Sequence, residues 1–236
     1  VINNCDKCVF TNEKAKDFTL RKYNQINREK GLVLAHCFDK SLFKDIKVKP
    51  SNKFTVRHLG NFYGKRNPRI FLKALIQINK SQPDFFKDIN FEFIGTISKK
   101  IRVNDLINKL PKNSVIFKDK VSYKNSLIKM KSSSLLLVID AFSKENIFLP
   151  SKLIEYLGAD VPIYGISNKG VTYDLLNEIG YTCDSSYQAK NIALSLQDFI
   201  KKIKENELNT YKKITNKYTI KNISKLFEKY IIDLIL

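Results

Sequence analysis

The sequence predicts an α/β protein built on a doubly wound, parallel, Rossmann-like sheet. From Phe54 onward, short strand-like runs alternate with amphipathic helix-like segments, and the connections between them are short. The run from Leu135 to Ile139 is continuously apolar, which is typical of a central parallel strand that is covered on both faces. In such sheets, ligands bind at the carboxyl ends of the strands.

The first 50 residues are predicted to hold one strand–helix–strand unit, which is too small to bury a core of its own. Residues 5–13 have a strand-like pattern that ends at Thr11–Glu13. Either Thr11 or Asn12 can cap a helix from about Glu13 to Tyr23, and an apolar strand follows at residues 31–35. The chain opens without an initiator Met and inside a strand-like pattern. We therefore expect residues 1–50 to be the last part of an N-terminal domain whose beginning is missing.

A Lys-rich stretch around Pro50 separates this unit from a longer domain, predicted at residues 51–205. Its expected strands lie at residues 54–59, 91–94, 115–117, 135–139, 161–166 and 181–183. Its expected helices lie at residues 69–80, 101–110, 123–132, 150–158, 173–179 and 189–205. Residues 206–236 form the third part, with a final helix from about Ile220 to Leu236.

The chain is strongly basic, with 42 Lys and Arg against 23 Asp and Glu and a formal net charge of +19. Such a surface favours an acidic partner, which could be nucleic acid, an anionic membrane or a phosphorylated substrate. The abundance of Lys, Asn and Ile leaves a second explanation open, namely the base composition of the genome. The sequence shows neither a run of about 18 apolar residues nor a signal peptide, so we expect a cytoplasmic protein.

Cys5 and Cys8 form a C-x-x-C pair. A zinc site would need two more ligands, and the adjacent residues His36 and Cys37 are poorly placed to complete one tetrahedron. A redox pair belongs at the start of a helix that follows a strand, whereas this pair enters a strand. We therefore predict reduced, partly buried thiols and no metal site.

Three loops follow predicted strands, so they should gather at one edge of the sheet. The first runs from Gly60 to Pro68. Its glycine lets the backbone approach a ligand closely, and Lys65 and Arg66 can neutralise a diphosphate. The alternative is a solvated basic loop. The glycine order is neither that of a Walker A loop nor that of a G-x-G-x-x-G dinucleotide-binding loop.

The second loop, residues 118–123, could hold a nucleobase, with Val121 and Tyr123 against the ring, although an ordinary strand–helix turn is the simpler explanation. The third, residues 148–163, opens a helix with Ser151 and Lys152 in its first turn and Glu155 in the next. A helix start favours an anion such as phosphate, and a carboxylate one turn later can accept hydrogen bonds from sugar hydroxyls. Its simpler explanation is a capped helix that packs its apolar face.

Together these motifs resemble the C-terminal, donor-binding half of GT-B glycosyltransferases, especially family 4. Residues 150–163 read PSKLIEYLGADVPI and match the PSKLxEYL variant found in bacterial surface-polysaccharide enzymes. The loop at Lys120–Tyr123 matches the family's loop before its fourth helix. The segments Cys5–Asn12 and Val33–Phe43 resemble the end of the family's first domain, and the terminal helix resembles the one that crosses back to it.

The resemblance implies a role for each matching residue. Glu155 would hold the ribose hydroxyls, and the backbone N–H groups of Lys152 and Leu153 would hold the distal phosphate. Arg66, together with Lys65, would stabilise the leaving diphosphate, which makes these two the expected catalytic residues. Gly60, Val121, Tyr123 and Ser151 complete the expected nucleotide-sugar site.

Two positions depart from the family pattern. Ile147 stands where the first of a pair of glutamates is usual, and Asn61 stands where an arginine directly follows the glycine. These departures remove an expected contact to the sugar and part of the phosphate clamp.

The expected function is transfer of a sugar from a UDP- or GDP-sugar to a glycan or lipid-linked acceptor, in bacterial surface polysaccharide or glycolipid synthesis. A retaining hexosyltransferase without a cofactor fits the resemblance best. The alternative is a fragment that binds the nucleotide or nucleotide sugar without transferring it. The positive charge also predicts peripheral association with an anionic membrane.

Two other classes are disfavoured. We expect no nucleic-acid partner, because no helix gathers Lys and Arg on one face. A nucleotide-sugar epimerase would need catalytic carboxylates and histidines, and the chain has only His36 and His58. His58 lies within a predicted strand, so we expect it to be a core residue with satisfied hydrogen bonds.

Overall fold

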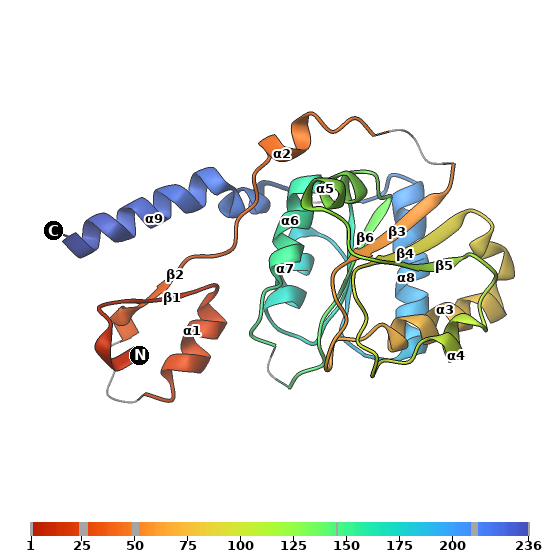
Figure 1. Ribbon diagram of the computed structural model, residues 1–236, viewed down its shortest axis with the longest axis horizontal. Coiled ribbons are helices and arrows are strands. Elements are labelled where there is room, and N and C mark those ends of the chain that lie inside the picture. The colour runs from red at the N-terminus through yellow and green to blue at the C-terminus, as the bar shows by residue number, and fades with distance from the viewer. Residues whose placement is uncertain (1, 24–27, 49–51, 145, 209–211, 236) are drawn as a thin grey trace.

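The computed structural model of the chain describes residues 2–23, 28–48, 52–144, 146–208 and 212–235 (Figure 1). Most of these residues build an α/β structure around one parallel sheet, which confirms the predicted fold class. Within the described ranges, no helix combines the length and the apolar character needed to cross a membrane.

The sheet has six parallel strands in the order β5-β4-β3-β6-β7-β8. The strands are β3 (Phe54–Leu59), β4 (Ile89–Ile94), β5 (Val115–Lys118), β6 (Leu135–Ile139), β7 (Ile163–Ile166) and β8 (Cys183–Asp184). The chain builds outward from β3 to β5, returns to β6 beside β3, and then builds outward in the other direction. The order therefore reverses between β3 and β6, and such a switch point is where open α/β sheets bind ligands.

Helices cover both faces of the sheet (Figure 1). On one face lie α3 (Arg69–Ser81), the short α4 (Asn104–Ile107) and α8 (Ala189–Lys204), and α3 contacts both of the others. On the other face lie α5 (Tyr123–Lys131), α6 (Ser151–Ala159) and α7 (Val171–Ile179), and α5 contacts α6. This two-sided cover explains why every residue of β6 is buried.

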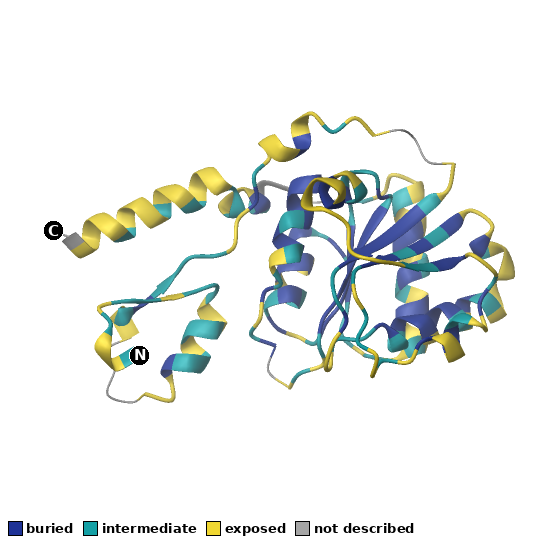
Figure 2. Ribbon diagram, viewed as in Figure 1, coloured by how far each residue is buried: buried dark blue, intermediate teal, exposed yellow. Residues whose placement is uncertain are grey.

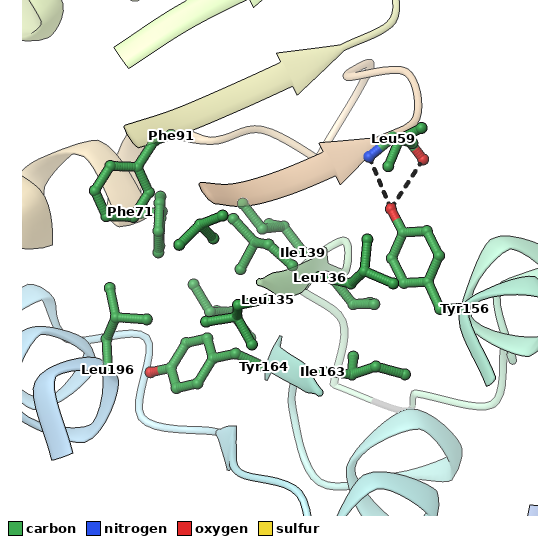
Figure 3. Packing of buried hydrophobic residues seen from close by; sticks show 14 of the residues in the cluster. Leu59, Phe71, Phe91, Leu135, Leu136, Ile139, Tyr156, Ile163, Tyr164 and Leu196 are labelled. Carbon is green, nitrogen blue, oxygen red and sulfur yellow. Dashed lines mark hydrogen bonds between the residues drawn. The ribbon is translucent and has the colours of Figure 1, made fainter. Parts of the chain in front are cut away.

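The core lies between the sheet and these helices, where Figure 2 shows the central strands as the most buried part of the molecule. Phe71 of α3 packs edge-on against Phe91 of β4, with ring centroids 5.7 Å apart, and both side chains are fully buried (Figure 3). Truncating a large buried aromatic residue of this kind costs about 3–5 kcal/mol of stability.

The N-terminal segment forms a separate two-stranded parallel sheet, β1 (Cys8–Phe10) and β2 (Gly31–Val33), joined through α1 (Glu13–Leu20). Asn12 caps α1, because its Oδ1 accepts the N–H of Ala15 at 2.9 Å. A short helix, α2 (Ser41–Lys44), follows β2. Its Phe43 packs against Gly158 of α6, where a Cβ would lie only 2.7 Å from the Phe43 ring.

The C-terminal segment returns to the N-terminal one. After a 3₁₀ turn at Lys212–Tyr218 comes α9 (Ile220–Ile235). Phe38 donates its N–H to Tyr218 and accepts the N–H of Ile220, both at 2.9 Å. Further along, the hydroxyl of Tyr230 donates to the carbonyl of Val33 at the end of β2. The two ends of the chain are therefore held side by side (Figure 1).

Several predicted boundaries were wrong. The helix predicted at residues 101–110 is only α4. Arg69 binds the carboxylate of Asp105 and the carbonyl of Arg102, and these contacts hold residues 101–103 in a loop. The helix predicted to stop at Gly158 continues to Ala159, and Asp160 ends it in the left-handed region at φ 57°. Strand β7 begins two residues later than predicted, beyond Pro162.

The remaining differences are smaller. Helix α1 ends at Leu20 instead of near Tyr23, and β2 ends at Val33 instead of Ala35. Strand β8 covers Cys183–Asp184 instead of residues 181–183. The sequence also gave no signal for α2. The predicted boundary around Pro50 lies partly outside the described residues, as do the final residue of the last predicted helix and part of residues 206–236.

Candidate functional site

A crevice opens where β3 and β6 separate. The middle of β3 pairs with the beginning of β6, where Val56 faces Leu135 and Arg57 faces Leu136. By contrast, β3 and β4 stay paired as far as Leu59. Beyond Arg57, side chains replace the ladder between β3 and β6. The Nδ1 of His58 lies 2.9 Å from the carbonyl oxygen of Leu137.

Tyr156 of α6 fills the rest of the gap (Figure 3). Its hydroxyl accepts the N–H of Leu59 at 2.7 Å and lies 3.3 Å from the carbonyl of the same residue. The side chain is 1% exposed, and burial raises the pKa of its phenol. A neutral hydroxyl that can both donate and accept therefore satisfies two main-chain groups that have lost their strand partner.

The ring of His58 is neutral near pH 7. Burial lowers its pKa to about 4, and the nearby charge of Arg66 adds to this effect, while the hydrogen bond to Leu137 opposes it. A carbonyl can only accept, so Nδ1 carries the proton and Nε2 is left with a free lone pair. This Nε2 has no hydrogen-bond partner, so the prediction of a fully satisfied core histidine was wrong.

The loop at Gly60–Pro68 folds Arg66 back over the crevice. The backbone turns at Gly64, whose φ of 56° suits glycine, and the N–H of Arg66 donates to the carbonyl of Tyr63 at 3.0 Å. The guanidinium then lies 3.6 Å from the carboxylate of Asp140, which directly follows β6 and is 5% exposed as a side chain. Lys65 points to solvent instead.

Two hydrogen bonds hold the carboxylate of Asp140 in place on the side away from Arg66. Its Oδ2 accepts from the hydroxyl of Ser167 at 3.0 Å and from the amide of Asn146 at 3.3 Å, while Oδ1 faces Arg66. Asn146 also donates to Ser167 at 2.6 Å, and all three residues are buried. This network at the ends of β6 and β7 holds a carboxylate where it can orient the guanidinium of Arg66.

Two buried polar atoms meet at the floor of the crevice. Across the described residues, the buried side-chain nitrogen and oxygen atoms without a partner are His58 Nε2 and Arg66 Nε. Both side chains line the same cavity of ≈ 40 Å³, together with Gly60, Lys152 and Leu153. An unpaired buried polar group costs about 1–3 kcal/mol. The acceptor His58 Nε2 and the donor Arg66 Nε, on side chains that line the same small cavity, therefore indicate that a polar ligand binds here.

The N-terminus of α6 forms the opposite wall. Pro150 precedes the helix and provides no side-chain cap, and the first turn has no acidic residue. The N–H of Leu153 donates to the carbonyl of Pro150 at 3.0 Å. The donors that remain for an anion are therefore the N–H groups of Ser151 and Lys152, one position earlier than the pair expected from the sequence.

Glu155 lies one turn further along α6 and pairs with Lys152, with Nζ and Oε2 2.5 Å apart. Partial burial, followed by the negative charges of Glu155 and Asp39, raises the pKa of Tyr123. Tyr123 and Val121 are 56% and 37% exposed. A flat ligand lying over this loop could therefore cover both side chains.

The structure thus brings Gly60, Arg66, Lys152 and Leu153 to one crevice, and Glu155 is joined to it through Lys152. Lys65 and Ser151 are exposed. Asn61, at one of the two departures, faces away, because its Oδ1 accepts the N–H of Thr96 at 3.0 Å. Ile147, at the other, accepts a hydrogen bond from Asn12 through its carbonyl.

Sequence reasoning missed His58, Asp140 and Tyr156. Asp140 carried a usable signal, because an acidic residue directly follows the most apolar strand. His58 and Tyr156 depend on which strands become neighbours, and the local pattern does not show this.

The Sγ atoms of Cys5 and Cys8 lie 3.0 Å apart, and both thiols are half-buried. The contact with Cys5, followed by burial, raises the pKa of Cys8. Among the described residues, no three His, Cys, Asp or Glu side chains gather as they would around a metal ion.

Comparisons with known proteins give a likeness in structure only. No protein-family model matches the chain, and no curated protein matches it in sequence. HepE of Anabaena, solved with UDP-glucose, superposes with a TM-score of 0.73 over 97% of this chain and 64% of its own, at 13% identity. A glycosyltransferase of Rickettsia africae gives 0.75 over 95% and 62%, at 16% identity.

The pneumococcal O-GlcNAc transferase GtfA, solved with UDP and GlcNAc, gives 0.70 over 99% of this chain and 46% of its own, at 13% identity. The chain thus spans between about half and two thirds of the length of these three proteins. At such low identity the likeness shows the fold, which agrees with the GT-B architecture expected from the motifs.

Proposed function

We propose that this chain is the donor-binding part of a glycosyltransferase and holds a nucleoside diphosphate sugar at the β3–β6 switch point. The observation that carries the proposal is the pair of unpartnered atoms, His58 Nε2 and Arg66 Nε, opposite the uncapped start of α6. Anion donors on one wall and a half-satisfied guanidinium on the other are the features that a diphosphate needs.

The ligand would lie across the mouth of the crevice, because the ≈ 40 Å³ floor is too small for a nucleotide. The distal phosphate would accept from the N–H groups of Ser151 and Lys152 and from the guanidinium of Arg66. The ribose hydroxyls would donate to Glu155, and the base would lie over Val121 and Tyr123. The neighbours solved with UDP favour uridine over guanosine as the base.

In the transfer, the bond between sugar C1 and the β-phosphate oxygen breaks, and a bond forms between C1 and an acceptor oxygen. The nucleoside diphosphate leaves with the electron pair and gains negative charge, and the acceptor hydroxyl gives up its proton. Arg66, held by Asp140, and the start of α6 would stabilise the developing charge, which is where most of the rate is gained. Lys65 could assist from the exposed side of the loop.

The finer assignment rests on the motif at residues 150–163. It favours a retaining hexosyltransferase that extends a bacterial surface polysaccharide or glycolipid. The charge of +19 supports work at an anionic membrane face, where basic side chains gain electrostatic attraction. Because the chain spans only part of its structural neighbours, binding without transfer is the second candidate.

Calorimetry of the full chain with UDP-, GDP- and ADP-glucose tests the donor site. We expect binding of UDP-glucose that Arg66→Ala weakens and that Lys73→Ala, an exposed change on α3, leaves unchanged. The proposal is wrong if no nucleotide or nucleotide sugar binds, or if Arg66→Ala has no effect. Release of UDP from UDP-glucose in the presence of an acceptor would separate transfer from binding alone.

A further inference from the structure

A second hollow, here called the α1 groove, lies between α1 and the loops that follow β6 and β7. Its volume is ≈ 430 Å³, within the range of small-molecule sites. One wall is formed by Lys14, Asp17 and Phe18 of α1 and by Arg21, which directly follows the helix. Asn146, Ile147, Lys169 and Gly170 form the other, and Arg28 closes one end.

Direct contacts hold the two walls together. Asn12 caps α1 with its side-chain oxygen and, with its amide nitrogen, donates to the carbonyl of Ile147 at 2.9 Å. Lys14 pairs with Asp174 of α7, with Nζ and Oδ2 2.5 Å apart. The groove is therefore held in shape by contacts between α1 and the segments that follow β6 and β7.

The groove has an excess of positive charge. Four cationic side chains and one carboxylate line it, and the charge of Lys14 is partly neutralised by Asp174. Arg28 and Lys169 are exposed and make no ion pair with any side chain in the described ranges. Phe18 adds an apolar surface, with the guanidinium of Arg21 4.4 Å from its ring centroid. A groove that holds these two unpaired cations and also an aromatic surface suits a small organic anion.

The groove also adjoins the donor crevice. Asn146 lines the groove and donates to Asp140, and Asp140 in turn faces Arg66. One buried hydrogen-bonded network thus separates the two spaces. A molecule in the groove would lie across this network from a donor whose phosphates occupy the crevice.

We propose that the α1 groove binds the acceptor, and that this acceptor carries a phosphate ester, recognised chiefly by Arg28 and Lys169. The proposal rests on the proposed glycosyltransferase function, since only a transferase needs an acceptor here. Phosphate is favoured over a neutral sugar because the cations lining the groove outnumber its one carboxylate, Asp17, and cations gain most from a compact dianion.

The test is amide NMR of the full chain with glucose 6-phosphate as the probe and glucose as the uncharged control. We expect shifts at Phe18, Ile147 and Gly170 with the phosphate and none with glucose. The shifts should persist when the crevice is saturated with UDP. Lys169→Glu and Arg28→Glu should each weaken binding about tenfold, the loss of one charge-assisted contact. The matched exposed change Lys73→Glu should have no effect.

Other outcomes overturn the proposal in distinguishable ways. Shifts confined to Gly60 and Leu153, and lost in Arg66→Ala, would place the phosphate in the crevice and leave the donor site standing. Groove shifts in a chain that binds no UDP-sugar would instead remove the transferase function and the acceptor role with it. Displacement of the probe by equimolar single-stranded DNA would identify the groove as part of a nucleic-acid surface.

Discussion

The hydroxyl of Tyr156 lies 2.7 Å from the main-chain nitrogen of Leu59, a residue 97 positions earlier in the chain. This contact joins the last residue of β3 to the middle of α6, beyond the point where the pairing of β3 with β6 has ended. At the end of β3, a side chain therefore takes the place of the backbone of a neighbouring strand (Figure 3).

Tyr156→Phe should destabilise the chain by about 1–3 kcal/mol, because it leaves the buried N–H of Leu59 unpaired without creating a cavity. Urea denaturation followed by circular dichroism measures the change. Tyr173→Phe is the control, since the hydroxyl of Tyr173 has no hydrogen bond that a described residue supplies. Equal stability of the two variants would show that the Tyr156 hydroxyl contributes nothing to the end of β3.

Arg66 and Lys65 should behave differently, although they are adjacent and both were predicted to act on the diphosphate. Arg66 lines the crevice and faces Asp140, whereas Lys65 is exposed. Arg66→Ala should weaken UDP binding about 10- to 100-fold, and Lys65→Ala less than about threefold. Calorimetry of both variants decides the matter, and a larger loss in Lys65→Ala would reverse the assignment.

Glu155 should matter for the ribose and not for the phosphates. Glu155→Gln keeps the size of the side chain but removes the charge that favours hydroxyl donors and holds Lys152. We expect UDP-glucose to bind about tenfold more weakly, with pyrophosphate affinity within about twofold of the original value. Glu178→Gln on α7 is the matched control. A parallel loss for both ligands would place Glu155 in the phosphate site through Lys152.

His58 should make the chain less stable in mild acid. Its pKa is about 4 in the folded chain and about 6.5 when unfolded, so the unfolded state binds the extra proton between these values. The free energy of unfolding should therefore fall as the pH is lowered from about 6.5 to 4, by up to about 3 kcal/mol from this group. Melting temperatures across this pH range measure the effect.

His58→Asn removes the titrating group and should flatten this part of the pH profile relative to the original chain, whereas His36→Asn at an exposed site should not. Because the chain has two histidines, imidazole NMR can follow both at once. A His58 resonance that titrates near pH 6.5 would contradict a buried ring.

Local pattern alone predicted every strand of the large sheet and the start of α6, because apolar runs, prolines and capping residues act over a few positions. It could not predict that β6 returns to lie beside β3, which depends on packing between distant segments. His58, Asp140 and Tyr156 acquire their roles only from that return. Arg66 and Lys152 could be predicted to lie near one another, because both follow strands whose carboxyl ends share an edge.

The short α4 also shows local sequence pattern giving way to contacts between distant segments. Residues 101–110 have an amphipathic pattern, but the tertiary contacts of Arg69 with Asp105 and Arg102 override it. Similarly, the helix at Gly158 continues because Phe38 and Phe43 fill the space above that residue, so its lack of a side chain serves packing and not termination.

The central position of β3 also has a consequence for synthesis on the ribosome. β3 can pair with β4 soon after both emerge, but its other edge stays open until β6 is made and Tyr156 follows. At about 5–20 residues per second, the 97 positions from Leu59 to Tyr156 take roughly 5–20 s, and the nascent chain exposes a hydrophobic strand edge throughout. Slow translation between residues 60 and 135 should therefore lower the yield of correctly folded protein, and a chaperone that shields this edge should restore it.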